Sequence, residues 1–327
     1  MSATSGGPGK SDTKNIDMRT TKIITITLLL ATLFVGCKKE NNGRISIFAE
    51  KFSNNSKVAI DPTDLSVSAE WVAGETIDLN GNVYTVSYDA TDDGYFLSDA
   101  GHPDGVAPLS TDMYAFYPGG SFGGNDVTVT NNADGTGEIV LNRLLVNIRT
   151  DGMQEMAFPM VAHADADNTK LPFRHLSGGF RIRLLNTTAN EVKVASLKIV
   201  AQSTSDVKHL GYDFDGDDVF DVTARWAVQG PSVPNGGIGG SDDDVDVRYT
   251  SEMYFDIKQG TENFVTIADG DNSPYFCIPV TISKVKNLTV IGYNVDGTEC
   301  FRATKKFDQE YDVERNKMYN LPEIEIR

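Results

Sequence analysis

The hydrophobic pattern of this 327-residue chain repeats every second residue, and this feature limits its fold most. Val83–Tyr88 and Phe180–Leu185 alternate apolar with polar side chains, as expected of strands with one buried face. No segment holds a helical period over about 12 residues with a capping residue, although 143–149 fits either a strand or a short helix. The chain is therefore predicted to be all-β. The predicted strands are 45–49, 83–88, 113–117, 127–130, 138–141, 180–185, 194–200, 252–257, 275–282, 288–293, 299–304 and 318–326.

The N-terminus is predicted to be a targeting segment rather than part of the fold. A basic start at Met18 leads into an uncharged apolar run, 23–35, which is shorter than the ~20 residues of a membrane span. This pattern is typical of a secretory signal peptide, so 18–36 is assigned to the signal and the polar residues 1–17 to an extra tail. Residues 37–44 are a short tether.

Cys37 follows Gly36 directly where the apolar run stops. A small residue before a Cys at this position resembles a bacterial lipobox, in which the thiol is lipidated and the chain is cleaved before the Cys. Two or three acyl chains anchor a protein stably. We therefore expect an outer-membrane lipoprotein exposed at the cell surface, the alternative being a plain signal peptide with an incidental Cys.

The charge balance excludes some partners. The chain has 29 Lys and Arg against 46 Asp and Glu, a net charge of −17. Loss of residues 1–36 leaves 25 against 44, a net charge of −19. Such a chain repels nucleic-acid phosphates and anionic lipid. The 4 His and 3 Cys are not at zinc-ligand spacings, and no nucleophile or phosphate-binding motif occurs, so an enzyme is not predicted.

A polar break at 164–170 lies near the middle of the secreted part. We predict two domains of ordinary size, 45–168 and 169–327, each a β-sandwich built from short strands with turns between them.

Several short phrases occur in an order that resembles a known family. They are AEWVAGETI at 69–77, YAFYP at 114–118, FPMVA at 158–162, FRHLSGGFRI at 173–182 and NKMYNL at 316–321. Together with the lipobox, this series resembles the fimbrillins, the lipoprotein pilins of type V pili. Trp71 and Phe116 within these phrases are predicted to be core anchors.

The resemblance implies two tandem transthyretin-like β-sandwich domains and assembly with other fimbrillin subunits by strand exchange. In that scheme a protease removes the N-terminal segment and first strand, and a neighbour's strand fills the groove. Arg44 resembles the maturation site, the alternative being an ordinary surface Arg. Residues 321–326 are strand-like and the chain ends at Arg327. The last strands are therefore the donors, or the chain is an accessory, tip or anchor subunit.

Two further sets of residues each have two possible interpretations. Asp213, Asp215, Asp217 and Asp221 alternate around Gly216, a spacing that resembles the start of a calcium loop, but Ala224 stands where a closing Glu is needed. The set is interpreted as a solvated acidic turn, with a weak calcium site as the alternative and no other cofactor expected. Cys277 and Cys300 are either a disulfide, which export permits, or two buried thiols.

The sequence thus predicts a non-enzymatic fimbrial or adhesion lipoprotein of the outer membrane, with other subunits and a host protein or glycan as candidate partners. The alternative is a surface glycan-binding lipoprotein of a nutrient-uptake system. In that case an exposed Trp71 or Trp226 would form the sugar platform.

Overall fold

The computed structural model describes residues 43–49, 71–149, 154–231 and 247–327. The expected signal peptide, Cys37 and most of the tether lie outside these residues. The described residues contain strands and turns without a helix, which confirms the all-β prediction. The ambiguous segment 143–149 belongs to a strand. Nowhere in the described ranges is there a helix long and apolar enough to cross a membrane.

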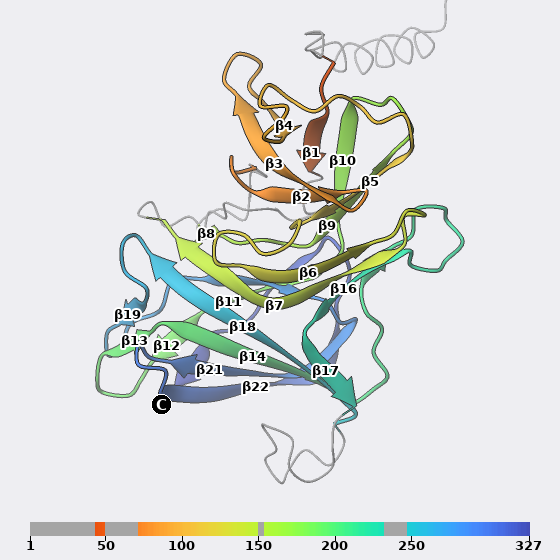
Figure 1. Cartoon of the computed structure of the whole chain (residues 1–327). Helices are drawn as coiled ribbons and strands as arrows, with labels where there is room; N and C mark the ends of the chain where they lie inside the picture. Colours follow the sequence, from red (N-terminus) through yellow and green to blue (C-terminus); the bar gives the residue numbers. More distant parts are fainter. Residues whose placement is uncertain (1–42, 50–70, 150–153, 232–246) are drawn as a thin grey trace, which may run out of the picture. The chain divides into compact units, whose positions relative to one another are not determined.

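The first group of strands closes into a barrel (Figure 1). Trp71 is buried at its centre, where its ring meets Tyr117 and Phe173 edge-on at centroid distances of 5.0 and 5.1 Å. Phe116 is fully buried as well, so both predicted core anchors are confirmed. Around the barrel the strands are β1 (Ser46–Ala49), β10 (Lys170–His175), β9 (Met160–Ala164), β5 (Met113–Tyr117), β2 (Thr76–Leu79), β3 (Asn82–Asp89) and β4 (Gly94–Ser98).

The second group contains a large sheet in which each main strand pairs with the next along one path. These are β15 (Gly211–Tyr212), β16 (Val222–Trp226), β7 (Gly137–Ile148), β18 (Tyr249–Gln259), β14 (Ser196–Ser203), β21 (Lys284–Tyr293) and β22 (Glu299–Asp312). Three short strands join β7 or β18: β6 (Asp126–Asn131), β8 (Gln154–Glu155) and β17 (Val228–Pro231).

Smaller sheets complete this group. They are β20 (Phe276–Val280), β11 (Gly178–Ile182) and β23 (Met318–Asn320); β12 (Leu184–Asn186) and β24 (Ile324–Ile326); and β13 (Val192–Val194) and β19 (Val265–Ile267). Trp226 of the large sheet is fully buried, and its indole N–H donates to the carbonyl of Pro279 in β20 at 3.1 Å. This bond joins the large sheet to the smaller one across the apolar core, because a buried indole N–H needs an acceptor.

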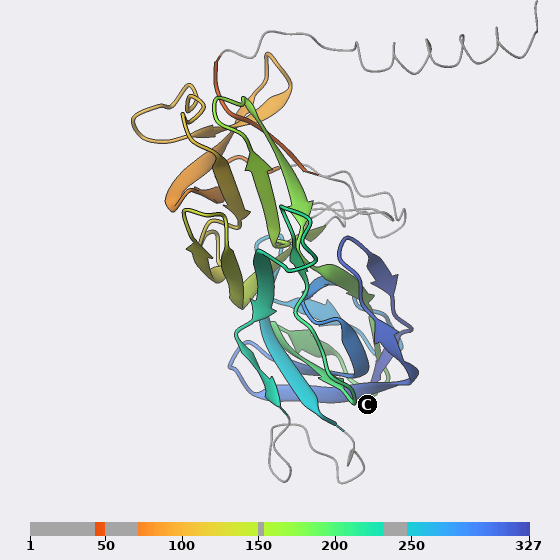
Figure 2. The ribbon, with the colours of Figure 1, turned by 90° about the vertical axis from the view of Figure 1, so that its right-hand side faces the viewer.

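The chain does not divide at the expected boundary between residues 168 and 169. β9 and β10 lie on either side of it and pair with each other, Arg174 with Val161. The polar break 164–170 is largely the turn of this hairpin, since surface turns and domain linkers share the same polar composition. Moreover, β6, β7 and β8 come from the first half of the chain but belong to the large sheet. Figure 2 shows the same strands from the side.

Gly119 shows how closely two backbones approach in the barrel. A Cβ at this position would lie 2.4 Å from the backbone N of Asp78, which is inside van der Waals contact. Gly119 also donates its N–H to the carbonyl of Thr76 at 2.8 Å. The turn after Tyr117 therefore requires a residue without a side chain.

The carboxylate of Glu310 ties β22 to the turn after β14. It accepts hydrogen bonds from Ser203 Oγ at 2.7 Å, from Thr204 N at 2.7 Å and from the hydroxyl of Ser205. Burial by itself would raise the pKa of Glu310, but these donors favour the charged form more strongly and lower the pKa to about 2.

We predict that this clamp makes the protein more stable above about pH 4.5 than at pH 2. The folded-state pKa is depressed, so the stabilisation is present above the unfolded value and is lost as the pH falls through the folded one. Glu310→Gln should reduce the free energy of unfolding by on the order of 2 kcal/mol at pH 7, after allowance for solvent screening, and by much less at pH 2. Urea denaturation at the two pH values measures both, and an equal loss at each would contradict the prediction.

Candidate functional site

The first described strand, β1, is paired with few residues of the barrel. β1 pairs in parallel with β10 over its whole length, from Ser46 with Lys170 to Ala49 with Phe173. On its other side it meets β4 at a single position, Ser46 with Phe96. A four-residue strand with one full ladder therefore closes the barrel (Figure 1).

Two isoleucines fix this strand in the core. Ile45 is fully buried and Ile47 is 3 % exposed, whereas Phe48 points outward and is 50 % exposed. The alternation is that of a strand with one buried face. Burying two such side chains contributes about 3–6 kcal/mol, so the strand is held firmly but by a small number of groups.

Arg44 is held in place at the start of this strand. Its guanidinium donates to Asp89 at 2.6 Å and to Asp92 at 3.4 Å, and it lies 4.0 Å from the centroid of the Phe96 ring. Its side chain is 13 % exposed. The hydrogen bond from Arg44, followed by that from the N–H of Thr91, lowers the pKa of Asp89 to about 2. We call Arg44, Asp89, Asp92 and Phe96 the Arg44 clamp.

The bond after Arg44 is protected in this fold. Ile45 donates its N–H to Val106 at 2.8 Å and accepts the N–H of Leu97 at 3.0 Å. A protease that is specific for Arg needs the side chain in its own pocket and the backbone in an extended, accessible form. Both conditions require Arg44 to leave the clamp and Ile45 to leave its two partners. Whether Arg44 is a maturation site stays a prediction.

The last strands lie along neighbouring strands of the same chain. β23 pairs in parallel with β11, Gly179 with Met318, and β24 pairs in parallel with β12, Leu184 with Ile324. The predicted strand 318–326 is thus divided in two. Ile324 and Ile326 are buried, and Thr187 bonds the carbonyl of Ile326 through both its N–H and its hydroxyl at 2.9 Å.

Both cysteines of the described chain are free thiols. Cys277 is fully buried in β20, and burial raises its pKa to about 12, an effect that Arg181 opposes in part. Cys300, at the start of β22, is partly buried, and burial raises its pKa too. The two strands belong to different sheets. Whether export leads to a disulfide between them stays a prediction, and raised pKa values leave little reactive thiolate at neutral pH.

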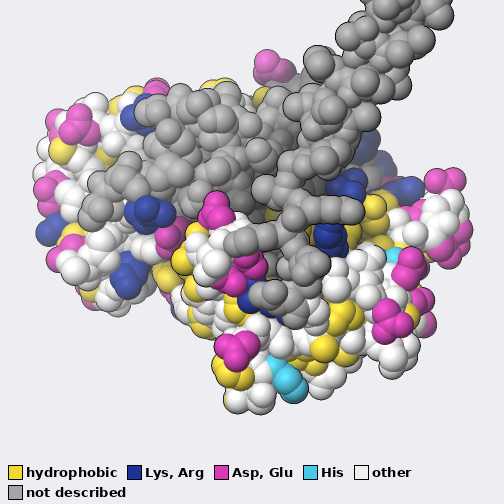
Figure 3. Space-filling model, turned by 90° about the horizontal axis from the view of Figure 1, so that it is seen from above, with side chains coloured by type: hydrophobic (Ala, Val, Ile, Leu, Met, Phe, Trp, Pro, Cys, Tyr) yellow, Lys and Arg dark blue, Asp and Glu magenta, His cyan; other side chains and the backbone are white. Residues whose placement is uncertain are grey.

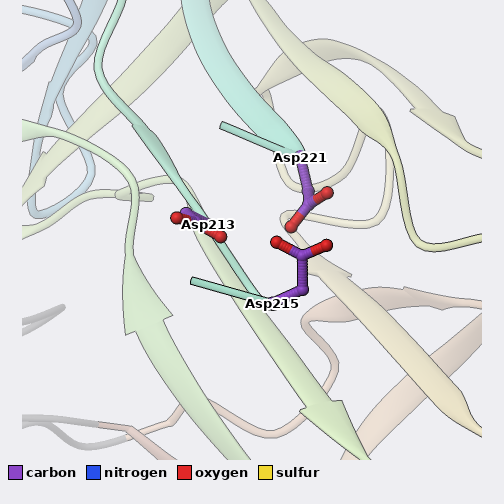
Figure 4. Close-up of side chains that lie close together, drawn as sticks. All are labelled: Asp213, Asp215 and Asp221. Carbon is purple, nitrogen blue, oxygen red and sulfur yellow. The ribbon is translucent and has the colours of Figure 1, made fainter. Parts of the chain in front are cut away.

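Three of the four predicted acidic ligands do come together. Carboxylate oxygens of Asp213, Asp215 and Asp221 lie within 4.8 Å of one another, and Figure 4 shows those of Asp215 and Asp221 facing each other. The side chain of Asp217 is outside this group and accepts the N–H of Val219 at 2.8 Å. The calcium alternative therefore stays untested, with three carboxylates rather than four.

Backbone N–H groups donate hydrogen bonds to the carboxylates of this acidic turn. Asp213 accepts the N–H groups of Gly216 at 2.6 Å and Asp218 at 2.9 Å, and these bonds lower its pKa. Asp215 accepts the N–H of Asp217, which lowers its pKa, yet the surrounding carboxylates and burial together raise it. Three carboxylates supply only part of the six to eight oxygens that calcium takes. The hydrogen bonds explain the loop conformation without an ion.

Sequence reasoning missed the partners of Arg44. Asp89 and Asp92 lie 45 and 48 residues further along the chain, and no local pattern relates them to Arg44.

The glycan-binding alternative from the sequence placed a sugar platform on Trp71 or Trp226. Their exposures are 4 % and 0 %, so neither ring is available for stacking. On the described surface in Figure 3, acidic and basic side chains are interspersed.

Comparisons with known proteins give limited information. No family model matches the chain, and no curated protein matches it. Among solved structures, a candidate cell adhesion protein of Bacteroides ovatus is 13 % identical, with coverage of 86 % of this chain and 94 % of that one and a TM-score of 0.36. A candidate cell adhesion protein of Bacteroides fragilis is 10 % identical, with coverage of 85 % and 91 % and a TM-score of 0.34.

A fimbrial protein of Bacteroides ovatus is 10 % identical, with coverage of 88 % of this chain and 51 % of that one and a TM-score of 0.24. Likeness at this level establishes neither a shared fold nor a shared activity. The sequence resemblance rests on residues of this chain alone.

We predict that Asp89→Asn makes the bond after Arg44 easier to cleave. The change removes the charge-assisted hydrogen bond at 2.6 Å, a contact worth about 1.5–3 kcal/mol. The rate of cleavage by an Arg-specific protease should rise roughly tenfold, followed by mass spectrometry of the product that begins at Ile45. Asp99→Asn is the control, because Asp99 pairs with His102 instead. Equal rates in wild type and Asp89→Asn would show that the clamp does not limit cleavage.

Proposed function

We propose that this chain is a non-enzymatic fimbrial or adhesion subunit that assembles with other subunits by strand exchange at β1. The place of β1 in the barrel supports this proposal: it is a first strand with a ladder to one neighbour and a single bridge to the other. The departure of such a strand breaks one ladder and a single bridge.

The groove left by β1 would attract a replacement strand. Loss of β1 uncovers one edge of β10 and the cavity filled by Ile45 and Ile47. Unpaired edges of sheets are templates for added strands, in which backbone hydrogen bonds give affinity and alternate side chains give specificity. We expect the incoming strand to carry apolar residues two positions apart, as β1 does.

We propose that the chain acts mainly as an acceptor of a strand. Its own last strands lie on β11 and β12, and Ile324 and Ile326 are buried there. Donating them would break both ladders and expose two apolar side chains, a cost of about 3–6 kcal/mol from burial alone. An accessory, tip or anchor position in a fimbrium is compatible with this arrangement.

We further propose that Cys37 is lipidated and holds the protein at the outer membrane. Support comes from the apolar run 23–35 that ends one residue before Gly36 and Cys37, because two or three acyl chains anchor stably where one does not. Detergent phase partitioning of the full chain and of Cys37→Ala tests this, with the variant expected in the aqueous phase.

The strand-exchange proposal predicts a protease-dependent assembly. Cleavage after Arg44 leaves β1 attached as the new N-terminal segment of the chain, without its link to Arg44. Treatment of the mature protein with an Arg-specific protease should therefore let β1 leave its groove and produce oligomers that resist mild denaturation, in which the β1 strand of one molecule fills the groove of another. Arg44→Ala should remain monomeric, and a peptide copying residues 45–49 should reduce oligomer formation in the wild type. Gel electrophoresis after mild and full denaturation gives the readout.

Arg248→Ala is a suitable control, since it removes an Arg of the described chain outside the Arg44 clamp. It should form oligomers as the wild type does. A protein that is cut after Arg44 and stays monomeric, alone and with the peptide bound, would contradict assembly of this chain with itself. A cut protein that neither oligomerises nor binds the peptide would overturn the proposal.

A further inference from the structure

A cavity of about 240 Å³ lies apart from β1 and the acidic turn. Its walls come from the start of β2, the turn after β5, the outer side of β7, and the residues after β8. Pockets for drug-sized ligands usually measure about 300–1,000 Å³. This volume is thus suited to one small ring rather than to an extended chain.

A tight turn presents an aromatic ring and an amide at the cavity. Phe122 and Asn125 bond each other through both backbone groups, at 3.1 and 2.9 Å, around Gly123 and Gly124. Both glycines have positive φ, 59° and 94°, which suits a two-residue hairpin turn. Asn125 Oδ1 accepts the N–H of Leu145 at 2.8 Å, which fixes the amide. Phe122 remains 40 % exposed.

The other polar groups of the cavity are fixed before any ligand binds. Glu75 is 9 % exposed and accepts hydrogen bonds from Tyr117 Oη at 2.5 Å and Val72 N at 3.0 Å. Asn147 donates to Glu155 at 2.7 Å. Lys258 adds one ammonium group. Preorganised groups of this kind lower the entropic cost of binding.

This lining excludes several ligand classes. Two carboxylates disfavour a phosphate or another anion. The carboxylate oxygens that a simple cation would need are already engaged, those of Glu75 by Tyr117 and Val72 and those of Glu155 by Asn147 and Arg149. A purely apolar ligand would strip water from Glu155 and Lys258 without replacing their hydrogen bonds. A sugar ring carries hydroxyls that both donate and accept, and its C–H face can cover the exposed ring of Phe122.

We propose that this cavity binds a neutral sugar residue of a glycan. Phe122 covers one face of the ring, while Asn125, Asn147, Glu155 and Lys258 exchange hydrogen bonds with its hydroxyls. The inference goes beyond strand exchange and does not depend on it. It also differs from the glycan platform expected from the sequence, which was placed on Trp71 and Trp226.

The test is binding of methyl glycosides of neutral hexoses and N-acetylhexosamines to the full chain, measured by saturation-transfer NMR and titration. We expect at least one of them to bind with a Kd of about 1 mM. Phe122→Ala should weaken that binding at least tenfold. Phe220→Ala is the matched control, because Phe220 is 45 % exposed and lies outside the cavity, and it should bind as the wild type does.

The proposal is overturned if no neutral glycoside binds at about 20 mM, since a Kd of order 1 mM would then give near saturation. It is also overturned if Phe220→Ala loses as much affinity as Phe122→Ala, or if N-acetylneuraminic acid or a simple amine binds in preference. Circular dichroism confirms that the variants are folded. The result is independent of the oligomer assay, so each proposal can fail alone.

Discussion

The twelve residues of β7 join the two halves of the chain in one sheet. One edge of β7 pairs in parallel with β16 and then with β18, and the other edge pairs in antiparallel with β6 and then with β8. The strand comes from the first half of the chain, directly between barrel strands β5 and β9. Since its backbone groups are satisfied by partners from both halves of the chain, the two halves cannot be separated without loss of the ladders to β16 and β18.

The barrel in turn depends on β1, which is short and lies next to the Arg44 clamp. In the clamp, the Arg44 guanidinium makes a charge-assisted hydrogen bond to Asp89 and lies over the face of the Phe96 ring. These interactions hold the Arg44 side chain and are separate from the backbone ladder between β1 and β10. Release of Arg44 therefore leaves the two hydrogen bonds of Ile45 and the pairing of β1 with β10 in place. Arg44 and Ile45 are thus held by contacts separate from the ladder that holds β1 on β10.

Period-two patterning identified most strands because many of them bury one face, as β6 and β7 do. It missed β9 and β10, because their residues were assigned in part to the phrases of the family resemblance and in part to a predicted linker, 164–170. A hairpin turn such as 164–170 has the composition of a linker, and only the ladder between Val161 and Arg174 distinguishes them. The Asp213, Asp215 and Asp221 cluster was predictable from local spacing. The Arg44 clamp and the cavity around Phe122 were not, since their members are far apart in the chain.

The sequence alone determined the class of the fold, the core roles of Trp71 and Phe116, and the acidic turn, because these follow from alternation, residue size and local spacing. Only the tertiary structure decided which strands pair, since pairing depends on contacts across long separations. It placed β7 in the large sheet, set the last strands on β11 and β12, left Cys277 and Cys300 apart, and buried Trp226. Local patterns specify which face of a strand is apolar, but many different strands could cover that face. Which strand does so depends on contacts between residues that are far apart in the chain.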